Sequence, residues 1–399
     1  MIPDPLFPID QIRNDTPGCL KLIHLNNAGS SLPSQETLDV MITYLRLEAR
    51  MGGYEAARLK AGNISSVYDS ISNLINAYSD EIAITESATR AWNMAFYSIK
   101  FAPGDRILIS ATEYISNYIA YAQIAKRNGI IVDVIPNEKN GQLSVTALEN
   151  MISSKVKLIA VTHVPSNSGS VQPAAVIGKI ANKAGIYYLL DACQSVGQMP
   201  IDVKEIGCDF LSVTGRKYLR GPRGTGFLFV RKEVINQLEP PFLDLHSAQW
   251  MGNNSYKIRL DARRFENWEF NIAAKLGLGA AVDYALKIGV CKAYSYIQSL
   301  SNYLRNLLSN VRNVCVYDQG ADLCGIVTFT IQNAALLKIR DKLMLEGVNV
   351  SITEATGQYW ANANGARPAM IRASVHYYNT PDEISRFVEI ISRIEPANL

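Results

Sequence analysis

Three apolar runs between residues 157 and 230 constrain the fold more than any other feature of this chain. They read LIAV, IYYLL and FLSV, and each is followed by polar residues and a connection. Strands that are covered on both faces have such continuous apolar runs, because neither face contacts water. The stretch therefore predicts buried parallel strands in an α/β fold.

Polar side chains stand just past the end of each run. They are Ser166 and Asn167, then Asp191 and Gln194, then Thr214, Arg216 and Lys217. In an open α/β sheet the carboxyl ends of neighbouring strands border one crevice. We therefore expect these side chains to converge.

Asp191 and Lys217 are the central pair. An acid that ends an apolar run is poorly solvated and needs a cationic partner. A lysine in a dry site has a lowered pKa and becomes a nucleophilic amine. Pyridoxal phosphate uses both groups, since it needs an amine for its aldehyde and a carboxylate for its ring nitrogen. A structural ion pair is the alternative for these two residues taken alone.

The surrounding motifs favour the cofactor. Asp-Ala-Cys-Gln at 191–194, Thr-Gly-Arg-Lys at 214–217 and Gly-Pro-x-Gly-x-Gly at 221–226 resemble the pyridoxal-phosphate fingerprint of the class V aminotransferase family. The resemblance runs from LNNAGSSLP near the start to RASVHYYNT near the end. It implies the α/β fold type I of pyridoxal-phosphate-dependent transferases. That fold has a large domain, with a mostly parallel seven-stranded sheet between helices, and a smaller C-terminal α/β domain.

We expect three regions along the chain. Residues 1–20 form an N-terminal arm, which its prolines should keep irregular. Residues 21–260 form the large cofactor-binding domain. Residues 261–399 form a linking helix and the small C-terminal domain.

The resemblance also implies roles for the residues at the strand ends. Lys217 binds the cofactor covalently and moves the Cα proton, and Asp191 keeps the ring nitrogen protonated. Gln194 donates to the phenolic oxygen, near Ser166 or Asn167. Thr214 and Arg216 bind the phosphate.

Two further segments belong to the expected cofactor site. Ser87, Ala88 and Thr89 stand at the first turn of a predicted helix, where free N–H groups and the helix dipole attract phosphate. Tyr114 follows a predicted strand and can stack on the pyridine ring. An ordinary N-cap and a half-buried surface aromatic are the alternatives.

Asn27, Ala28, Gly29 and Arg372 are the expected substrate-binding residues. The first three lie in a turn-rich segment that lines the substrate pocket in the family, although turn and N-cap chemistry explains them equally well. Arg372 lies between apolar neighbours, and its guanidinium fork fits the α-carboxylate of an amino acid. An internal salt bridge is the alternative for Arg372.

Composition excludes several classes of function. The net charge of +3 does not favour a nucleic-acid partner, and no apolar run is long enough to span a membrane. The 6 Cys form no C-x-x-C pair, so we expect no metal site. The first residues do not read as a signal peptide, which predicts a cytoplasmic protein. A homodimer and a small amino-acid substrate are implied by the resemblance.

The reaction is less constrained than the cofactor. Desulfurases of this family carry a catalytic Cys on the segment before the final arginine, and residues 353–371 here contain none. Motifs such as THVPSNSG and TGRKYLRGPRGTG look most like hercynylcysteine sulfoxide lyase and its relatives. They imply β-elimination from cysteine or an S-substituted cysteine, which gives pyruvate and ammonia. A cysteine desulfurase is the less favoured reading.

Three other readings stay open. The first is an epimerase similar to isopenicillin N epimerase, with Tyr114 or Tyr359 as a proton donor. The second is an aminotransferase, and the third is a non-catalytic α/β protein. Residues 353–370 form a candidate mobile lid over the site.

Overall fold

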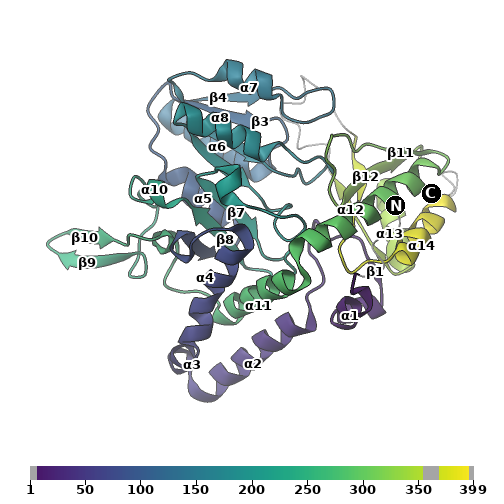
Figure 1. The fold of residues 1–399 in the computed structure, drawn as a ribbon, viewed down its shortest axis with the longest axis horizontal. Helices are drawn as coiled ribbons and strands as arrows, with labels where there is room; N and C mark the ends of the chain where they lie inside the picture. Colours follow the sequence, from purple (N-terminus) through teal and green to yellow (C-terminus); the bar gives the residue numbers. More distant parts are fainter. Residues whose placement is uncertain (1–6, 354–367, 395–399) are drawn as a thin grey trace.

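The computed structural model describes residues 7–353 and 368–394. They form a large part around one sheet and a smaller part around a second sheet, joined by two consecutive helices (Figure 1). The expected lid at 353–370 lies almost wholly outside the described residues, as does Tyr359.

The large part is built on a seven-stranded sheet with the order β2-β8-β7-β6-β5-β3-β4. Only β8 runs antiparallel to its neighbours. The predicted mostly parallel sheet is therefore confirmed. Its strands are β2 (Ile82–Thr85), β3 (Arg106–Ser110), β4 (Ile131–Ile135), β5 (Val156–Thr162), β6 (Tyr187–Asp191), β7 (Phe210–Thr214) and β8 (Gly226–Val230).

Helices cover both faces of this sheet, which explains its continuous apolar runs. Side chains alternate between the two faces of a strand. In β3, Ile107 and Ile109 pack in the cluster with α5 and α6, and Leu108 packs in the cluster with α4, α8 and α11. These helices are α4 (Ala61–Ile75), α5 (Ala88–Ser98), α6 (Ile115–Asn128), α8 (Ala174–Ala184) and α11 (Ile272–Ile288). Shorter or outer helices are α2 (Gln35–Met51), α3 (Gly53–Leu59), α7 (Val145–Met151), α9 (Val203–Ile206) and α10 (Lys232–Ile235).

The smaller part contains a four-stranded antiparallel sheet with the order β11-β12-β15-β14. Its strands are β11 (Val314–Val316), β12 (Ile326–Ile331), β14 (Ser351–Thr353) and β15 (Met370–Ser374). Its helices are α12 (Val290–Ser309), α13 (Leu336–Leu345) and α14 (Pro381–Ser392). α12 follows α11 directly, so these two helices connect the two parts.

The N-terminal segment from residue 7 to residue 20 is not irregular, and for these residues the prediction is wrong. It contains helix α1 (Ile9–Asn14) and a 3₁₀ turn at Pro17–Leu20, because Pro8 and Pro17 stand where helices begin, a position that tolerates proline. Ile12 is fully buried in the core of the smaller part. β1 (Ile23–His24) then pairs with β13 (Val348–Asn349), so the start of the chain is bound to its C-terminal part.

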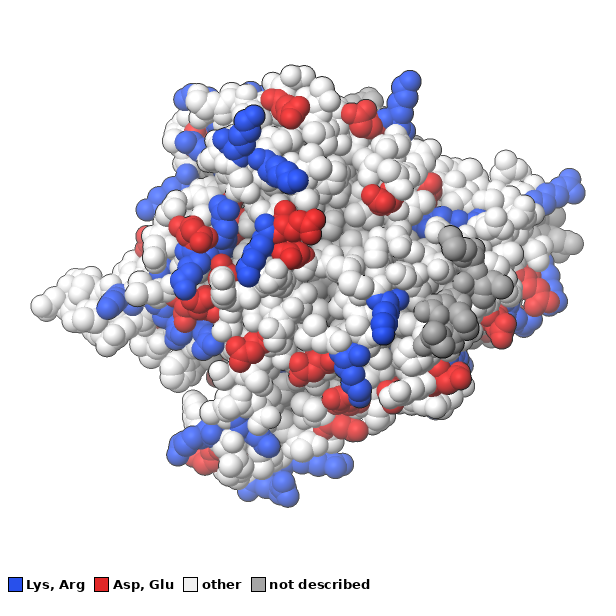
Figure 2. Space-filling model, viewed as in Figure 1, with Lys and Arg blue, Asp and Glu red and all other residues white. Residues whose placement is uncertain are grey.

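An antiparallel hairpin of β9 (Ala248–Gly252) and β10 (Ser255–Ile258) projects from the large part (Figure 1). No helix within the described residues is long and apolar enough to cross a membrane. On the face shown in Figure 2, acidic and basic side chains are interspersed over the large part.

Candidate active site

A cavity of about 260 Å³ lies at the carboxyl ends of β5, β6 and β7 and at the starts of α5 and α6. The strand-end residues converge there as predicted by the topology of such sheets. The predicted residues that line it are Ser87, Ala88, Thr89, Tyr114, Ser166, Asp191, Gln194, Thr214, Arg216 and Lys217. Asn167, Asn27, Ala28, Gly29 and Arg372 do not line it.

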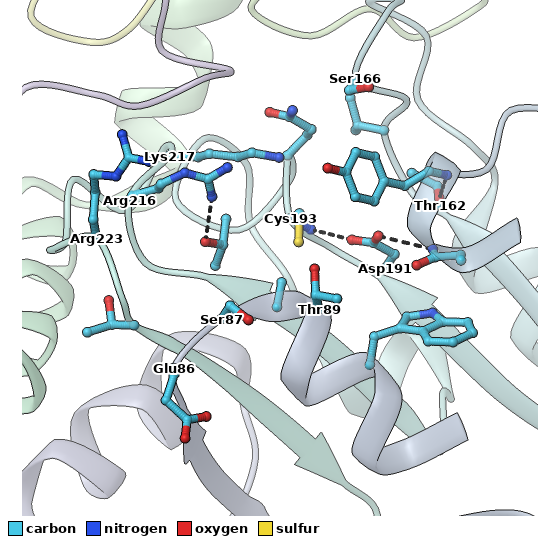
Figure 3. A pocket seen from close by; sticks show the side chains of 18 of the residues that line it. Glu86, Ser87, Thr89, Thr162, Ser166, Asp191, Cys193, Arg216, Lys217 and Arg223 are labelled. Atoms are coloured by element: carbon cyan, nitrogen blue, oxygen red, sulfur yellow. Dashed lines mark hydrogen bonds between the residues drawn. The ribbon is translucent and has the colours of Figure 1, made fainter. Parts of the chain in front are cut away.

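Lys217 enters the cavity from the turn after β7 (Figure 3). Its side chain is buried, with 9% of the residue exposed, and burial lowers the pKa of its amine. Within residues 7–353 and 368–394, no hydrogen bond or ion pair binds this amine. A buried amine with a lowered pKa is a nucleophile rather than one half of a structural ion pair.

Asp191 is the last residue of β6 and is 5% exposed. The backbone N–H of Cys193 donates to its Oδ1 at 3.0 Å, and Asn117 Nδ2 donates to its Oδ2 at 3.4 Å. Figure 3 shows both bonds and places Asp191 and Lys217 on different sides of the cavity. The carboxylate is thus oriented by neutral donors and remains available to a cationic group in the cavity.

The start of α5 forms an anion-binding end of the cavity. The first N–H groups of a helix have no partner within the helix, and Ala88 and Thr89 line the cavity there. The hydroxyl of Ser87 caps the helix by accepting from the N–H of Arg90 at 3.1 Å.

β8 lies close against this end because residue 226 is glycine. A Cβ on Gly226 would lie 2.9 Å from the carbonyl carbon of Ser87 and 3.0 Å from the nitrogen of Ala88. The last glycine of the Gly-Pro-x-Gly-x-Gly motif is therefore required for the close approach of strand and helix. The motif contains a turn at Arg223 and Gly224, and it follows Lys217 closely along the chain.

Thr214 and Arg216 complete the anion-binding end. Arg216 Nη1 donates to Thr214 Oγ1 at 2.9 Å, which holds the guanidinium over the cavity. Helix dipole, hydroxyl groups and a guanidinium together suit a phosphate.

Gln194 and Tyr114 also line the cavity. Gln194 Nε2 donates to the carbonyl of Ala28 at 3.0 Å, and its buried Oε1 has no partner among the described residues. Tyr114, at the start of α6, is 42% exposed and lines the mouth of the cavity.

Arg372 approaches the cavity from β15 of the smaller part. Its Nη1 donates to the carbonyl of Ser166 at 2.7 Å and its Nη2 to Asn26 Oδ1 at 3.4 Å. Its Nε has no partner, and no carboxylate within the described ranges pairs with this guanidinium. Its charge lowers the pKa of Lys217, so the two cations are near neighbours. The internal salt bridge that would explain Arg372 structurally is not found in this part of the chain.

The segment at residues 27–29 contributes mainly structure. Asn27 is fully buried, and its amide donates to the carbonyls of His24 and Ser374 and accepts from Tyr378. Ala28 contacts the site through its carbonyl, which binds Gln194.

Sequence reasoning did not identify several residues that line the cavity. They are Glu86, Trp92, Asn117, Thr162, Val164, Cys193, Arg223, Gly224 and Thr225. Asn117 carried a usable signal, because it stands in the first turn of the helix that follows β3 at the carboxyl edge of the sheet. Thr162 ends β5 and carried the same kind of signal.

The residues present fit pyridoxal phosphate. Lys217 supplies a buried amine without a partner in the described ranges, Asp191 supplies a carboxylate, and the start of α5 supplies helix N–H groups that can accept an anion. Gln194 Oε1, which lines the cavity, and Arg372 Nε, in the smaller part, are buried polar atoms without partners among the described residues. Within the described residues no group of His, Cys, Asp and Glu is arranged to bind a metal ion.

Comparison with known proteins places this geometry in context. The family model described as Aminotransferase class-V matches residues 23–387. A probable cysteine desulfurase of Halalkalibacterium halodurans is 30% identical over 390 residues, which are 95% of this chain and 94% of the relative.

Solved structures share the fold. The apo structure of a cysteine desulfurase from Thermococcus onnurineus NA1 matches with a TM-score of 0.89 and 24% identity over 98% of both chains. The cystine C-S lyase C-DES, solved with its reaction product cysteine persulfide, matches with a TM-score of 0.86 and 21% identity over 96% of this chain and 100% of the other. At these identities the likeness concerns the fold alone.

Proposed function

Because this chain belongs to the class V aminotransferase family, we propose that it is a pyridoxal-phosphate-dependent enzyme that breaks the C–S bond of cysteine or an S-substituted cysteine. The proposed reaction is β-elimination, and its products are pyruvate, ammonia and the sulfur-bearing leaving group. The observation that carries the proposal is the buried amine of Lys217, which has no partner in the described part of the chain and shares one cavity with Asp191.

Each site residue has a defined task in this reaction. When bound, pyridoxal phosphate supplies an aldehyde for the substrate amine and a ring that accepts the electrons of Cα. Lys217 holds the cofactor and moves the Cα proton. Asp191 holds the ring nitrogen protonated. Arg372, whose Nε has no partner among residues 7–353 and 368–394, binds the α-carboxylate and so fixes the orientation of Cα.

The names of the relatives support sulfur chemistry at a cysteine side chain. The relative from Halalkalibacterium halodurans is named a probable cysteine desulfurase. The same fold carries a cysteine desulfurase and a cystine C-S lyase, so the fold does not choose between them.

Cysteine desulfuration is the second candidate, and the names of the relatives favour it. A desulfurase transfers sulfur to a protein thiolate and leaves alanine, which requires a reactive Cys. Residues 353–371 contain no Cys. Cys193 lines the cavity, but burial raises the pKa of its thiol well above the usual value. Burial also raises the pKa of Cys324 to about 11. Neither thiol is suited to accept sulfur at neutral pH.

Product analysis separates the candidates. The purified protein is loaded with pyridoxal phosphate and incubated with cysteine, cystine and a panel of S-substituted cysteines. We expect pyruvate and ammonia in equal amounts, and no product from Lys217→Ala. Formation of alanine together with a protein persulfide would show that the reaction is desulfuration and not elimination. Exchange of the Cα hydrogen with solvent deuterium, without loss of the side chain, would indicate an epimerase. Conversion of the cofactor to its amine form would indicate an aminotransferase.

We also propose that the chain forms a homodimer. Large apolar side chains are exposed on and near the β9–β10 hairpin, including Trp250, Met251 and Trp268. Exposed apolar patches on a folded protein commonly mark an interface. A second copy is the proposed partner of this surface.

A further inference from the structure

A second buried carboxyl group lies behind Asp191 and has no assigned role. It belongs to Glu113, in the loop between β3 and α6, and is 5% exposed. Within residues 7–353 and 368–394, no Lys, Arg or His forms an ion pair with it. A buried carboxylate without a cation is unfavourable, so its state depends on its hydrogen bonds and on nearby charges.

The donors to Glu113 are all neutral. Ser110 Oγ and the N–H of Thr162 each donate to Oε1 at 2.6 Å. Asn117 Nδ2 donates to Oε2 at 3.1 Å and the hydroxyl of Tyr121 at 3.3 Å. These neutral donors can stabilise the ionised carboxylate of Glu113. None of them carries a positive charge that would keep Glu113 ionised at every pH.

Asn117 connects Glu113 to Asp191. Its Nδ2 donates to Glu113 Oε2 at 3.1 Å and to Asp191 Oδ2 at 3.4 Å. A primary amide has two N–H bonds, so it can serve both carboxylates at once. Because Cys193 holds the other oxygen of Asp191, the orientation of Asp191 depends on Asn117 and, through it, on Glu113.

Asp191 is the charged group that interacts electrostatically with Glu113 when Glu113 is ionised. The other titratable neighbours are Tyr118 and Tyr121 of α6 and Tyr188 of β6. Burial raises the pKa of all three tyrosines, so they are neutral near pH 7. Burial, and secondarily the charge of Asp191, raises the pKa of Glu113 to about 7. Glu113 therefore changes its charge near neutral pH, directly behind the carboxylate that faces the cavity.

We infer that Glu113 is a positioning residue that acts through Asn117, and that in its ionised form it strengthens the hold of Asp191 on the protonated ring nitrogen of the cofactor. The inference rests on the proposed function, because it requires pyridoxal phosphate in the cavity. Above neutral pH, Glu113 adds a negative charge behind Asp191. Below neutral pH that charge is lost and the ring nitrogen is held less strongly.

A cofactor analogue isolates this effect. Dissociation constants are measured at pH 6 and pH 8.5 for pyridoxal phosphate and for its 1-deaza analogue, in which carbon replaces the ring nitrogen. At pH 8.5, Glu113→Gln should weaken binding of pyridoxal phosphate by about tenfold, the equivalent of one pKa unit of coupling. Binding of the analogue should not change. At pH 6 the difference between the wild type and Glu113→Gln should shrink, because protonated Glu113 is neutral like glutamine.

Two more variants keep the test decisive. Asn117→Ala removes the link and should reproduce the pattern of Glu113→Gln, which matters if Glu113→Gln does not fold. Tyr118→Phe is the matched control, because its hydroxyl donates to the carbonyl of Ser110 at 3.4 Å and, among the described residues, hydrogen-bonds to the carboxyl group of neither Glu113 nor Asp191. It should bind both probes like the wild type.

The outcomes distinguish this inference from the proposed function. If Glu113→Gln and Asn117→Ala weaken both probes equally, or neither, the inference is overturned while the proposed function stands. If the wild type binds no pyridoxal phosphate, the proposed function itself fails.

Discussion

At the scale of single residues, Lys217 makes the cofactor-free protein less stable. Its amine is buried without a partner in the described part of the chain, which costs about 1–3 kcal/mol for a buried donor. Lys217→Met should therefore raise the free energy of unfolding of the cofactor-free protein by about that amount. Urea unfolding measures it, and Lys232→Met at an exposed surface pair with Asp80 is the control.

The same residue predicts a pH dependence. Its pKa in the folded protein is lowered from 10.5 by burial. Between that lowered value and 10.5 the unfolded chain binds more protons than the folded one, so stability should rise with pH across this window. The rise should be absent in Lys217→Met. Identical pH slopes in the two proteins would show that Lys217 is not the group responsible.

Arg372 is expected to select amino acids by their carboxylate. Arg372→Lys loses the planar fork and should lower kcat/KM by about 10- to 100-fold, mostly through KM, as expected for a charged hydrogen bond of about 1.5–3 kcal/mol. Steady-state kinetics with an S-substituted cysteine measures the change. Arg340→Lys, at an exposed pair with Asp341, should behave like the wild type. A variant Arg372→Lys with unchanged KM would remove Arg372 from the substrate site.

The sequence could predict residues whose position follows from one strand, but not those whose role follows from contacts between strands. Asp191 and Lys217 were predicted because each stands at the end of an apolar run. Glu113 was not, because its role depends on a link through Asn117 to Asp191, and Asp191 lies 74 residues beyond Asn117 along the chain. Asn27 was expected to face the substrate, yet its amide is bound within the interior.

At the scale of elements, the contact between β8 and the start of α5 shapes the end of the cavity where we expect the phosphate of the cofactor to bind. Gly226→Ala places a methyl group 2.5 Å from the carbonyl oxygen of Val213 and 2.9 Å from the backbone of Ser87. The strand and helix must then separate, which should cost about 1–3 kcal/mol of stability and weaken cofactor binding. Thermal unfolding and cofactor titration measure the two effects.

Gly62→Ala is the control for this substitution. Gly62 lies in α4 with nothing within 4 Å of an added Cβ. Alanine forms helices better than glycine, so this variant should be at least as stable as the wild type. Equal cofactor affinity in Gly226→Ala and Gly62→Ala would contradict the role of the β8–α5 contact.

The elements of the core could be predicted from the apolar pattern of the sequence, but the peripheral elements could not. The strands β5 to β7 were predicted because both of their faces are buried. The β9–β10 hairpin was not, because its side chains are largely exposed and follow no apolar alternation. α1 was not predicted, because the prolines suggested irregular chain, although Pro8 only marks its start.

At the scale of the whole molecule, the cavity depends on both parts of the chain. Arg372 of the smaller part binds Ser166, and Asp318 of the smaller part accepts from the N–H of Gly169 at 3.2 Å. The loop after β5 belongs to the large part, but hydrogen bonds from the smaller part hold it in position. Sequence patterns describe single elements and carry no signal for such contacts.

The exposed hairpin predicts an assembly of two chains. Trp250 is 60% exposed and Met251 is 57% exposed, so replacing both with glutamate should leave the fold intact and abolish association. Light scattering should give twice the chain mass for the wild type and the single chain mass for the double variant. Lys257→Glu on the same hairpin is the matched control and should still dimerise. A wild type with the mass of one chain would rule out the proposed dimer.

The most direct test of the central claim is to identify the amine that holds the cofactor. The protein is saturated with pyridoxal phosphate, reduced with borohydride, digested and sequenced by mass spectrometry. We expect a single phosphopyridoxyl modification, on Lys217. The variant Lys217→Ala should carry no such modification. Modification spread over surface lysines, or none at all, would contradict the assignment of this cavity as the active site.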